Sequence, residues 1–142
     1  MDYFVLDKSG NGFSRFEEFS EKHILVEIDG NGLDEDKLFA AYGSQIYSEE
    51  RSSLNPIFEN SNYFGRNYDA FAECLSIAPQ AIGQDVFVTH SNLLFAPKDL
   101  MDIYFDMMRE ESASNWTDGR TFFLFTKQDK DILFELYLSE RA

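Results

Sequence analysis

The fold class is decided by residues 84–126, QDVFVTHSNLLFAPKDLMDIYFDMMREESASNWTDGRTFFLFT. The apolar run Val86-Phe87-Val88 predicts a buried strand over 84–90, and Pro97 favours the first position of a following helix. Apolar side chains then recur at helical spacing, at Leu100, Met101, Tyr104, Met107 and Met108. After a turn at 115–120, residues 121–126 predict another core strand. A strand, a helix and a strand in this order indicate an α/β fold with parallel strands.

The preceding residues extend the same alternation. Residues 24–29, ILVEID, predict a strand that ends at the turn Gly30-Asn31-Gly32. The acids at 34–36 suit the first turn of a helix, whose apolar positions are Leu38, Phe39, Tyr42 and Ile46. A polar connection over 47–66 follows, and connections of this length are often functional. A second helix is expected over 67–78, ending near Pro79.

The two ends of the chain extend this core. Asn-Gly within Ser9-Gly10-Asn11-Gly12 predicts a hairpin over residues 2–16. At the other end, a polar turn over 127–130 and a fourth strand over 132–138 are expected. We therefore predict a single domain over 1–142, with a core at about 24–126 and terminal extensions at 1–23 and 127–142 that add strands.

The composition narrows the function. Twenty-six Asp and Glu residues against twelve Lys and Arg residues give a formal net charge of −14, which repels nucleic acids and anionic membranes and attracts a basic partner. The single cysteine, Cys74, forms no intrachain disulfide. No signal peptide or membrane span is evident, so a cytoplasmic protein that is monomeric when free is expected.

Two acids lie on one face of the helix expected over 67–78. At about 100° per residue, Asp69 and Glu73 share one face, whereas Phe71, Cys74, Leu75 and Ala78 share the opposite face. Like charges four residues apart cost a few tenths of a kcal/mol, so the pair contributes little to folding. The pattern indicates either a solvated face or a site for a basic partner.

The stretch Tyr63-Phe64-Gly65-Arg66-Asn67-Tyr68-Asp69-Ala70, with Glu73 following, resembles the signature of the barstar family of ribonuclease inhibitors. More loosely, the resemblance extends from about residue 24 to residue 126. It implies a small parallel three-stranded sheet flanked by helices. Two positions depart from the namesake: Ala72 replaces a Trp and Arg66 replaces an acid. Both departures indicate a different target.

The resemblance also implies a binding site. In this family, the helix and the loop before it block the active site of a ribonuclease, with acids in place of substrate phosphates. Carried over from the resemblance, Asp69 is the central acid and Glu73 the second acid. Tyr63 is then an aromatic contact, and Gly65 and Asn67 present backbone and amide groups. Arg66 belongs to the same loop, and Glu110 near the end of the next helix is a further acid.

The expected function is therefore that of an immunity-type protein, which inhibits a basic ribonuclease toxin and needs no cofactor or metal. A non-inhibitory adaptor domain that binds a basic protein is the alternative. An acidic enzyme is a third interpretation, which the sequence favours less.

Three other signals have plainer explanations. Asp7 to Glu18 fits part of a calcium-binding loop, but too few residues precede it for an entering helix, so a polar turn is expected. His23 and His90 could suggest an acid–base pair, but each is expected to border a strand. Cys74 is expected to be a small buried apolar residue rather than a nucleophile.

Overall fold

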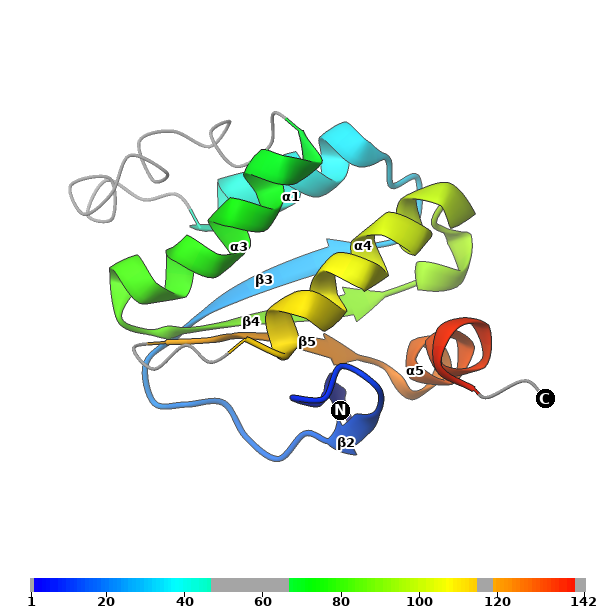
Figure 1. Cartoon of the computed structure of the whole chain (residues 1–142), viewed down its shortest axis with the longest axis horizontal. Helices are drawn as coiled ribbons and strands as arrows, with labels where there is room; N and C mark the ends of the chain where they lie inside the picture. The colour runs from blue at the N-terminus through cyan, green and yellow to red at the C-terminus, as the bar shows by residue number, and fades with distance from the viewer. Residues whose placement is uncertain (1, 47–66, 115–118, 140–142) are drawn as a thin grey trace.

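The computed structural model, which describes residues 2–46, 67–114 and 119–139, contains a mixed five-stranded sheet in the order β2-β1-β5-β4-β3. The strands are β1 (Phe4–Leu6), β2 (Phe13–Arg15), β3 (His23–Asp29), β4 (Asp85–Ser91) and β5 (Thr121–Phe125). The described helices are α1 (Glu35–Ile46), α3 (Tyr68–Ile82), α4 (Lys98–Ser112) and α5 (Lys127–Leu133), with a 3-10 turn η2 (Leu93–Phe95) and a π-helical turn η3 (Phe134–Leu138). Helices α1, α3 and α4 lie on one face of the sheet (Figure 1).

The predicted parallel core is present as β3, β4 and β5. Ile28 pairs with His90 and Val88 pairs with Phe123, both in parallel register. Along β3, side chains alternate between buried and exposed, as expected when helices cover only one face of the sheet. The prediction of an α/β fold is confirmed, whereas the sheet as a whole is mixed.

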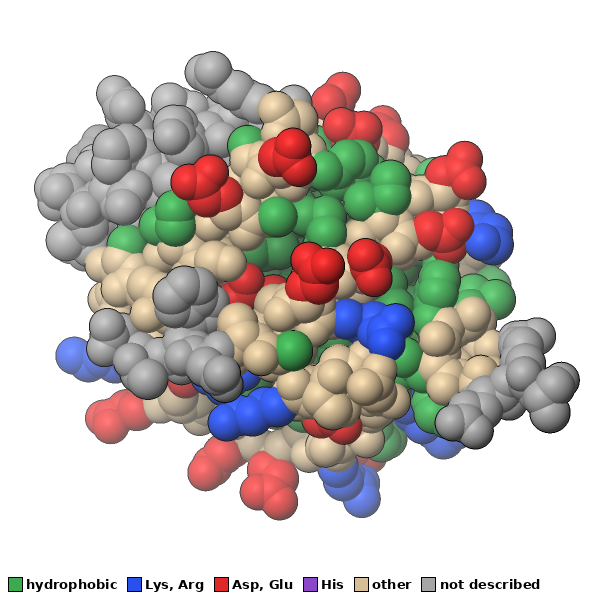
Figure 2. Space-filling view, in the orientation of Figure 1, with side chains coloured by type: hydrophobic (Ala, Val, Ile, Leu, Met, Phe, Trp, Pro, Cys, Tyr) green, Lys and Arg blue, Asp and Glu red, His purple; other side chains and the backbone are tan. Residues whose placement is uncertain are grey.

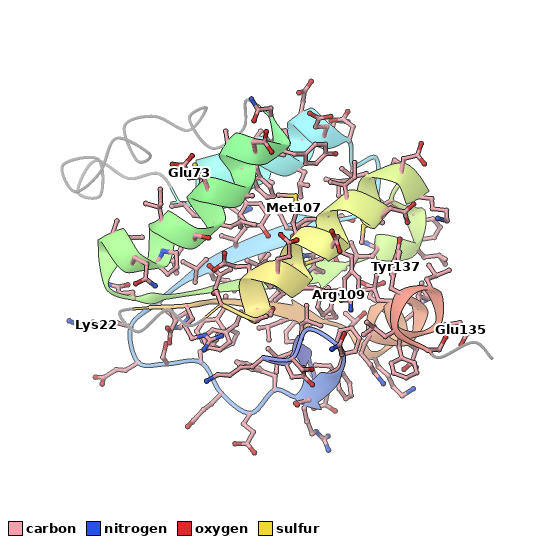
Figure 3. The ribbon with its side chains drawn as sticks, viewed as in Figure 1. Lys22, Glu73, Met107, Arg109, Glu135 and Tyr137 are labelled. Atoms are coloured by element: carbon pink, nitrogen blue, oxygen red, sulfur yellow. The ribbon has the colours of Figure 1, made fainter. Side chains whose placement is uncertain are left out.

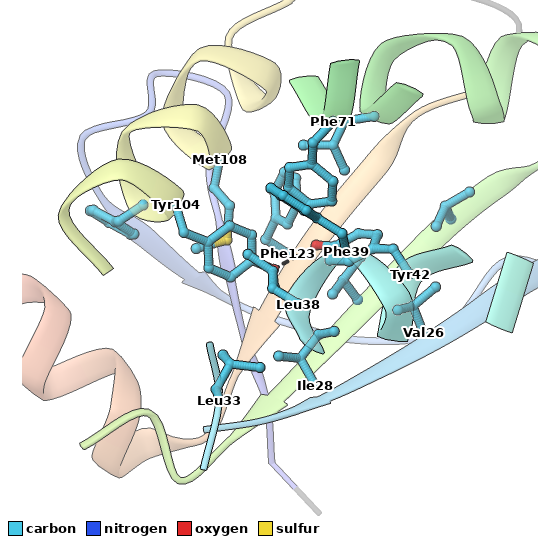
Figure 4. Close-up of a cluster of buried hydrophobic side chains, with 14 of the residues drawn as sticks. Val26, Ile28, Leu33, Leu38, Phe39, Tyr42, Phe71, Tyr104, Met108 and Phe123 are labelled. Carbon is cyan, nitrogen blue, oxygen red and sulfur yellow. Dashed lines mark hydrogen bonds between the residues drawn. The ribbon is translucent and has the colours of Figure 1, made fainter. Parts of the chain in front are cut away.

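The core lies between the three helices and the sheet. Leu38, Phe39, Tyr42 and Ile46 of α1 are buried, which confirms the predicted apolar face of that helix. Phe71 of α3 and Tyr104 and Met108 of α4 pack into the same cluster (Figure 4). Burial of one such apolar side chain stabilises a fold by about 1.5–3 kcal/mol. The buried side chains between the helices and the sheet are therefore the main source of stability.

The N-terminal extension forms the predicted hairpin. β1 and β2 pair antiparallel, with Leu6 opposite Phe13. At the turn, Asp7 Oδ1 accepts a hydrogen bond from the backbone N–H of Ser9, and Gly10 has a positive φ of 72°. β1 also pairs antiparallel with β5, which is why the sheet is mixed.

The expected end of α3 at Pro79 is wrong, because the helix continues to Ile82. A proline cannot donate to the carbonyl four residues earlier, here that of Leu75. Thr121 Oγ1, from β5, donates to this carbonyl at 3.2 Å and supplies the missing hydrogen bond. Pro97, predicted at the first position of α4, is instead its N-cap residue, and the helix begins one residue later, at Lys98.

The expected C-terminal strand over 132–138 is also wrong, because these residues belong to α5 and η3. Thr126 caps α5 by accepting a hydrogen bond from the backbone N–H of Asp129, and Lys127 pairs with Asp131 at 2.8 Å across one helical turn. The predicted polar turn at 127–130 is thus the first turn of this helix. β1 already occupies the edge of β5 where a C-terminal strand could pair.

Candidate functional site

The first turn of α3 is fixed from two sides. Asn67 caps the helix: its Oδ1 accepts a hydrogen bond from the backbone N–H of Ala70 at 2.8 Å. The ring of Tyr68 packs edge-on against Phe39 of α1, with 5.3 Å between ring centroids. Burial and the nearby charge of Glu35 raise the pKa of Tyr68, which stays neutral in this contact. The start of the helix is therefore held in one orientation.

The two predicted faces of α3 are present. Phe71, Cys74 and Leu75 are buried, whereas Asp69 and Glu73 are exposed. Figure 3 labels Glu73 on α3. Burial, with a smaller contribution from Glu73, raises the pKa of the Cys74 thiol to about 11. Cys74 is therefore a neutral apolar group at pH 7, as expected, and not a nucleophile.

The cations of the neighbouring helix do not neutralise these acids. α3 itself contains no Lys or Arg. In α4, Lys98 Nζ pairs with Asp102 at 3.0 Å, and Arg109 donates to the carbonyl of Gly10 at 2.7 Å and to Asn11 Oδ1 at 2.6 Å. Among the residues that the structure describes, Asp69 and Glu73 have no ion pair. Figure 2 shows acidic side chains spread over α3 and α4 on this face.

A groove of about 180 Å³ lies between α3 and α4, and Glu110 of α4 lines it together with residues of α3. Its walls include the small side chains Ala72 and Ser76 on one side and Met107 on the other. Glu110 is exposed, like Asp69 and Glu73. The three predicted acids of the two helices are thus all exposed, with Glu110 beside the groove that α3 and α4 form, and we call Asp69, Glu73 and Glu110 the acidic face.

Sequence reasoning missed a polar contact that joins the two helices. Glu111 is 8% exposed, and Ser76 Oγ donates to its carboxylate at 2.5 Å. The hydroxyl of Ser114 lies 3.3 Å from the other carboxylate oxygen. Met107 and Glu111 are four residues apart on α4, which hints at a shared face, but only packing identifies Ser76 as the partner.

Other predicted site residues lie outside the described part of the chain. These are Tyr63, Gly65 and Arg66, together with the whole connection over 47–66. Their expected roles remain predictions.

The two histidines do not form a catalytic pair. His23 is opposite Asp85 in the sheet, five residues before His90, which places them about 16 Å apart along the strands. His90 is buried: its Nδ1–H donates to the carbonyl of Leu124 at 2.8 Å, and its Nε2 accepts from the Tyr104 hydroxyl at 2.6 Å. Tyr42 in turn donates to Tyr104 at 2.5 Å. Burial lowers the pKa of His90 to about 4.

Neither a cluster of metal-ligating side chains nor a membrane-spanning helix is found among the described residues. They contain no group of three or more His, Cys, Asp or Glu side chains arranged to hold a metal ion. None of the described helices is long and apolar enough to cross a bilayer.

Comparison with known proteins identifies the family. Residues 52–127, more than half of the chain, match the family model described as barstar, the barnase inhibitor. No curated protein and no solved structure matches the chain. The matched range contains α3, α4 and all three residues of the acidic face. The chain therefore belongs to the barstar family.

Proposed function

From this family membership we propose that the chain inhibits a basic ribonuclease toxin by placing α3 and the loop before it in the active site of the enzyme. The observation that carries the proposal is the exposed pair Asp69 and Glu73 on a helix whose opposite face is buried in the core. The barstar family is one of ribonuclease inhibitors, which supports a protein that binds a nuclease rather than an enzyme.

The electrostatics of the acidic face suit such a target. A ribonuclease active site is a cationic cleft that binds phosphate, so exposed carboxylates can occupy the positions of substrate phosphates. The net charge of −14 accelerates the encounter with a basic protein, and the acceleration decreases as salt screens it. Because Asn67 and Tyr68 fix the start of α3, little conformational entropy is lost when the acids bind.

The small side chain of Ala72 affects which ribonuclease the chain can bind. This side chain leaves the groove between α3 and α4 open. A target that fills this groove with a side chain of its own would gain contact area there. Together with Arg66 in the preceding loop, this favours a target that differs from barnase.

The test is an RNA-cleavage assay in which the chain is titrated against a basic ribonuclease, with barnase first and then nucleases that co-purify with the chain. Asp69→Asn and Glu73→Gln are expected to weaken inhibition strongly. Glu21→Gln is the matched control, because it removes the same charge from an exposed position outside α3 and α4. Equal inhibition by all three variants would refute the site.

The same assay separates the alternative function. A non-inhibitory adaptor would bind a basic protein through the same face and leave its RNA cleavage unchanged. Binding measured by calorimetry, together with full nuclease activity in the complex, would therefore favour the adaptor.

A further inference from the structure

A second surface lies where η2 meets the C-terminal helix, away from the acidic face. A cleft of about 180 Å³ separates the two elements, with apolar walls that include Leu94, Met101, Ile132 and Leu136. Leu94 and Leu136 are 54% and 51% exposed, so the rim of the cleft leaves a large apolar area in water. Figure 3 shows the C-terminal turn with Tyr137, which also lines the cleft.

Beside the cleft stands Phe95, which is 64% exposed, more than any other large apolar side chain in the described part of the chain. Phe95 does not line the cleft of its own chain. An apolar cavity of about 150 Å³ accommodates a benzene molecule, so a cleft of this size suits a single phenyl ring. The same surface therefore presents both an aromatic knob and a hole that fits it.

Lys98, a charged residue that lines the cleft, is paired within the chain, unlike the acids of the acidic face. Lys98 pairs with Asp102, and Asp131 pairs with both Lys127 and Lys130. Tyr137 also donates to Asp102 at 2.6 Å. In a protein with a net charge of −14, two copies repel each other least where the local charge cancels.

Pairing through the sheet edge at β3 is blocked. Gln45 of α1 donates from its side-chain amide to the carbonyl of Glu27 and accepts from the backbone N–H of the same residue, at 2.9 and 2.7 Å. These are the groups that a strand from another molecule would use, so the middle of this edge is already occupied. A second copy would therefore not bind by strand addition at this edge.

We propose that two copies of this chain associate about a two-fold axis at the η2–α5 surface, with Phe95 of each copy in the cleft of the other. In such an interface, the same residues meet from both sides, and the association closes at two copies. The contact is small, so the dimer is weak. This proposal differs from the monomer expected from the sequence, and it does not depend on the proposed inhibition.

Sedimentation of the full chain at up to about 1 mM tests the proposal. A species of twice the 16.5 kDa monomer mass is expected, and it becomes more abundant as salt rises, because salt screens the repulsion between two acidic chains. Binding to a basic nuclease has the opposite salt dependence, so the two proposals fail separately. A monomer at all concentrations and salt levels, or an assembly that grows beyond two copies, would overturn the dimer.

Two variants test the knob and the hole in turn. Phe95→Ser removes the ring, and Ala96→Leu narrows the cleft that Ala96 lines. Each is expected to weaken self-association at least tenfold, whereas Phe19→Ser, which removes another exposed ring, leaves it unchanged. A mixture of Phe95→Ser and Ala96→Leu retains one intact contact and should associate better than either variant alone. If both single variants dimerise like the parent, or if Phe19→Ser weakens the dimer equally, the assignment is wrong.

Discussion

On the outward face of α3, Asp69 and Glu73 are exposed and have no ion pair with a described residue. Between the helices and the sheet, Tyr42, Tyr104 and His90 are buried and form one continuous chain of hydrogen bonds. A buried polar group that loses its partner costs about 1–3 kcal/mol, whereas an exposed like-charge pair costs a few tenths. The buried chain therefore contributes to stability, and the exposed acids are free to serve binding. Substitutions in the two regions test whether stability and binding are separated in this way.

The largest effect is expected for Asp69→Ala and Glu73→Ala in binding to the ribonuclease. Truncating one partner of a buried ion pair costs about 2–5 kcal/mol, which is a loss in affinity of about 30-fold to several thousandfold. Stability should change by less than about 0.5 kcal/mol, because neither side chain contacts the core. Calorimetric binding and urea unfolding of the same samples measure both. A large loss of stability would show that the two acids also contribute to folding, which would contradict the separation of binding from stability.

Acid should destabilise the fold through His90. The pKa of His90 is about 4 in the folded protein and about 6.5 when unfolded, so the unfolded chain takes up the proton first as the pH falls. The contribution of neutral His90 to the free energy of unfolding is fully present above pH 6.5. It is lost progressively as the pH falls to 4, and the total loss is about 3 kcal/mol. Urea unfolding between about pH 7 and about pH 4 measures the loss.

His23→Gln is the control for this pH dependence, because His23 is only half-buried and lies at the other end of the sheet. Its stability should follow the same pH curve as the parent protein. If His23→Gln flattened the curve, His90 would not be its source.

Tyr104→Phe should cost about 1–3 kcal/mol, because it leaves His90 Nε2 without this donor and removes an acceptor of the Tyr42 hydroxyl. Tyr137→Phe is the matched variant: it removes a hydroxyl that donates to Asp102 near the surface and should cost less. Thermal unfolding ranks the two. Equal losses would mean that burial of the hydrogen-bond chain adds nothing.

The smallest effect is expected for Asn67→Ala, at about 1 kcal/mol of stability, because the first turn of α3 loses its cap. Asn67→Ser should recover most of this loss, since serine also caps helices well. Because α3 carries the acids, Asn67→Ala should also weaken nuclease binding slightly. Urea unfolding and calorimetry measure the two effects. If Asn67→Ala destabilised the fold as much as Tyr104→Phe, the exposed end of α3 would matter to stability as much as the buried chain.

Local pattern was enough to predict most of the fold. The strands over 24–29 and 121–126 and the buried face of α3 were all predicted, because side chains repeat every two residues in a strand and every 3.6 in a helix. Residues 132–138 were misassigned because a short apolar run fits both periods. These residues form a helix rather than a strand because Thr126 caps the helix and because β1 already occupies the neighbouring sheet edge.

The order of most helices and strands, the excess of negative charge and the placement of Asp69 and Glu73 opposite the apolar side of α3 all follow from the pattern of residues along the chain. The continuation of α3 past Pro79 depends instead on packing between elements, because Thr121 from a distant strand donates to the carbonyl of Leu75. The same packing places Glu110 across a groove from Ala72 and forms the cleft beside Phe95. Periodicity sets which way a side chain points from its own helix or strand, whereas the partner that it contacts depends on how separate elements pack.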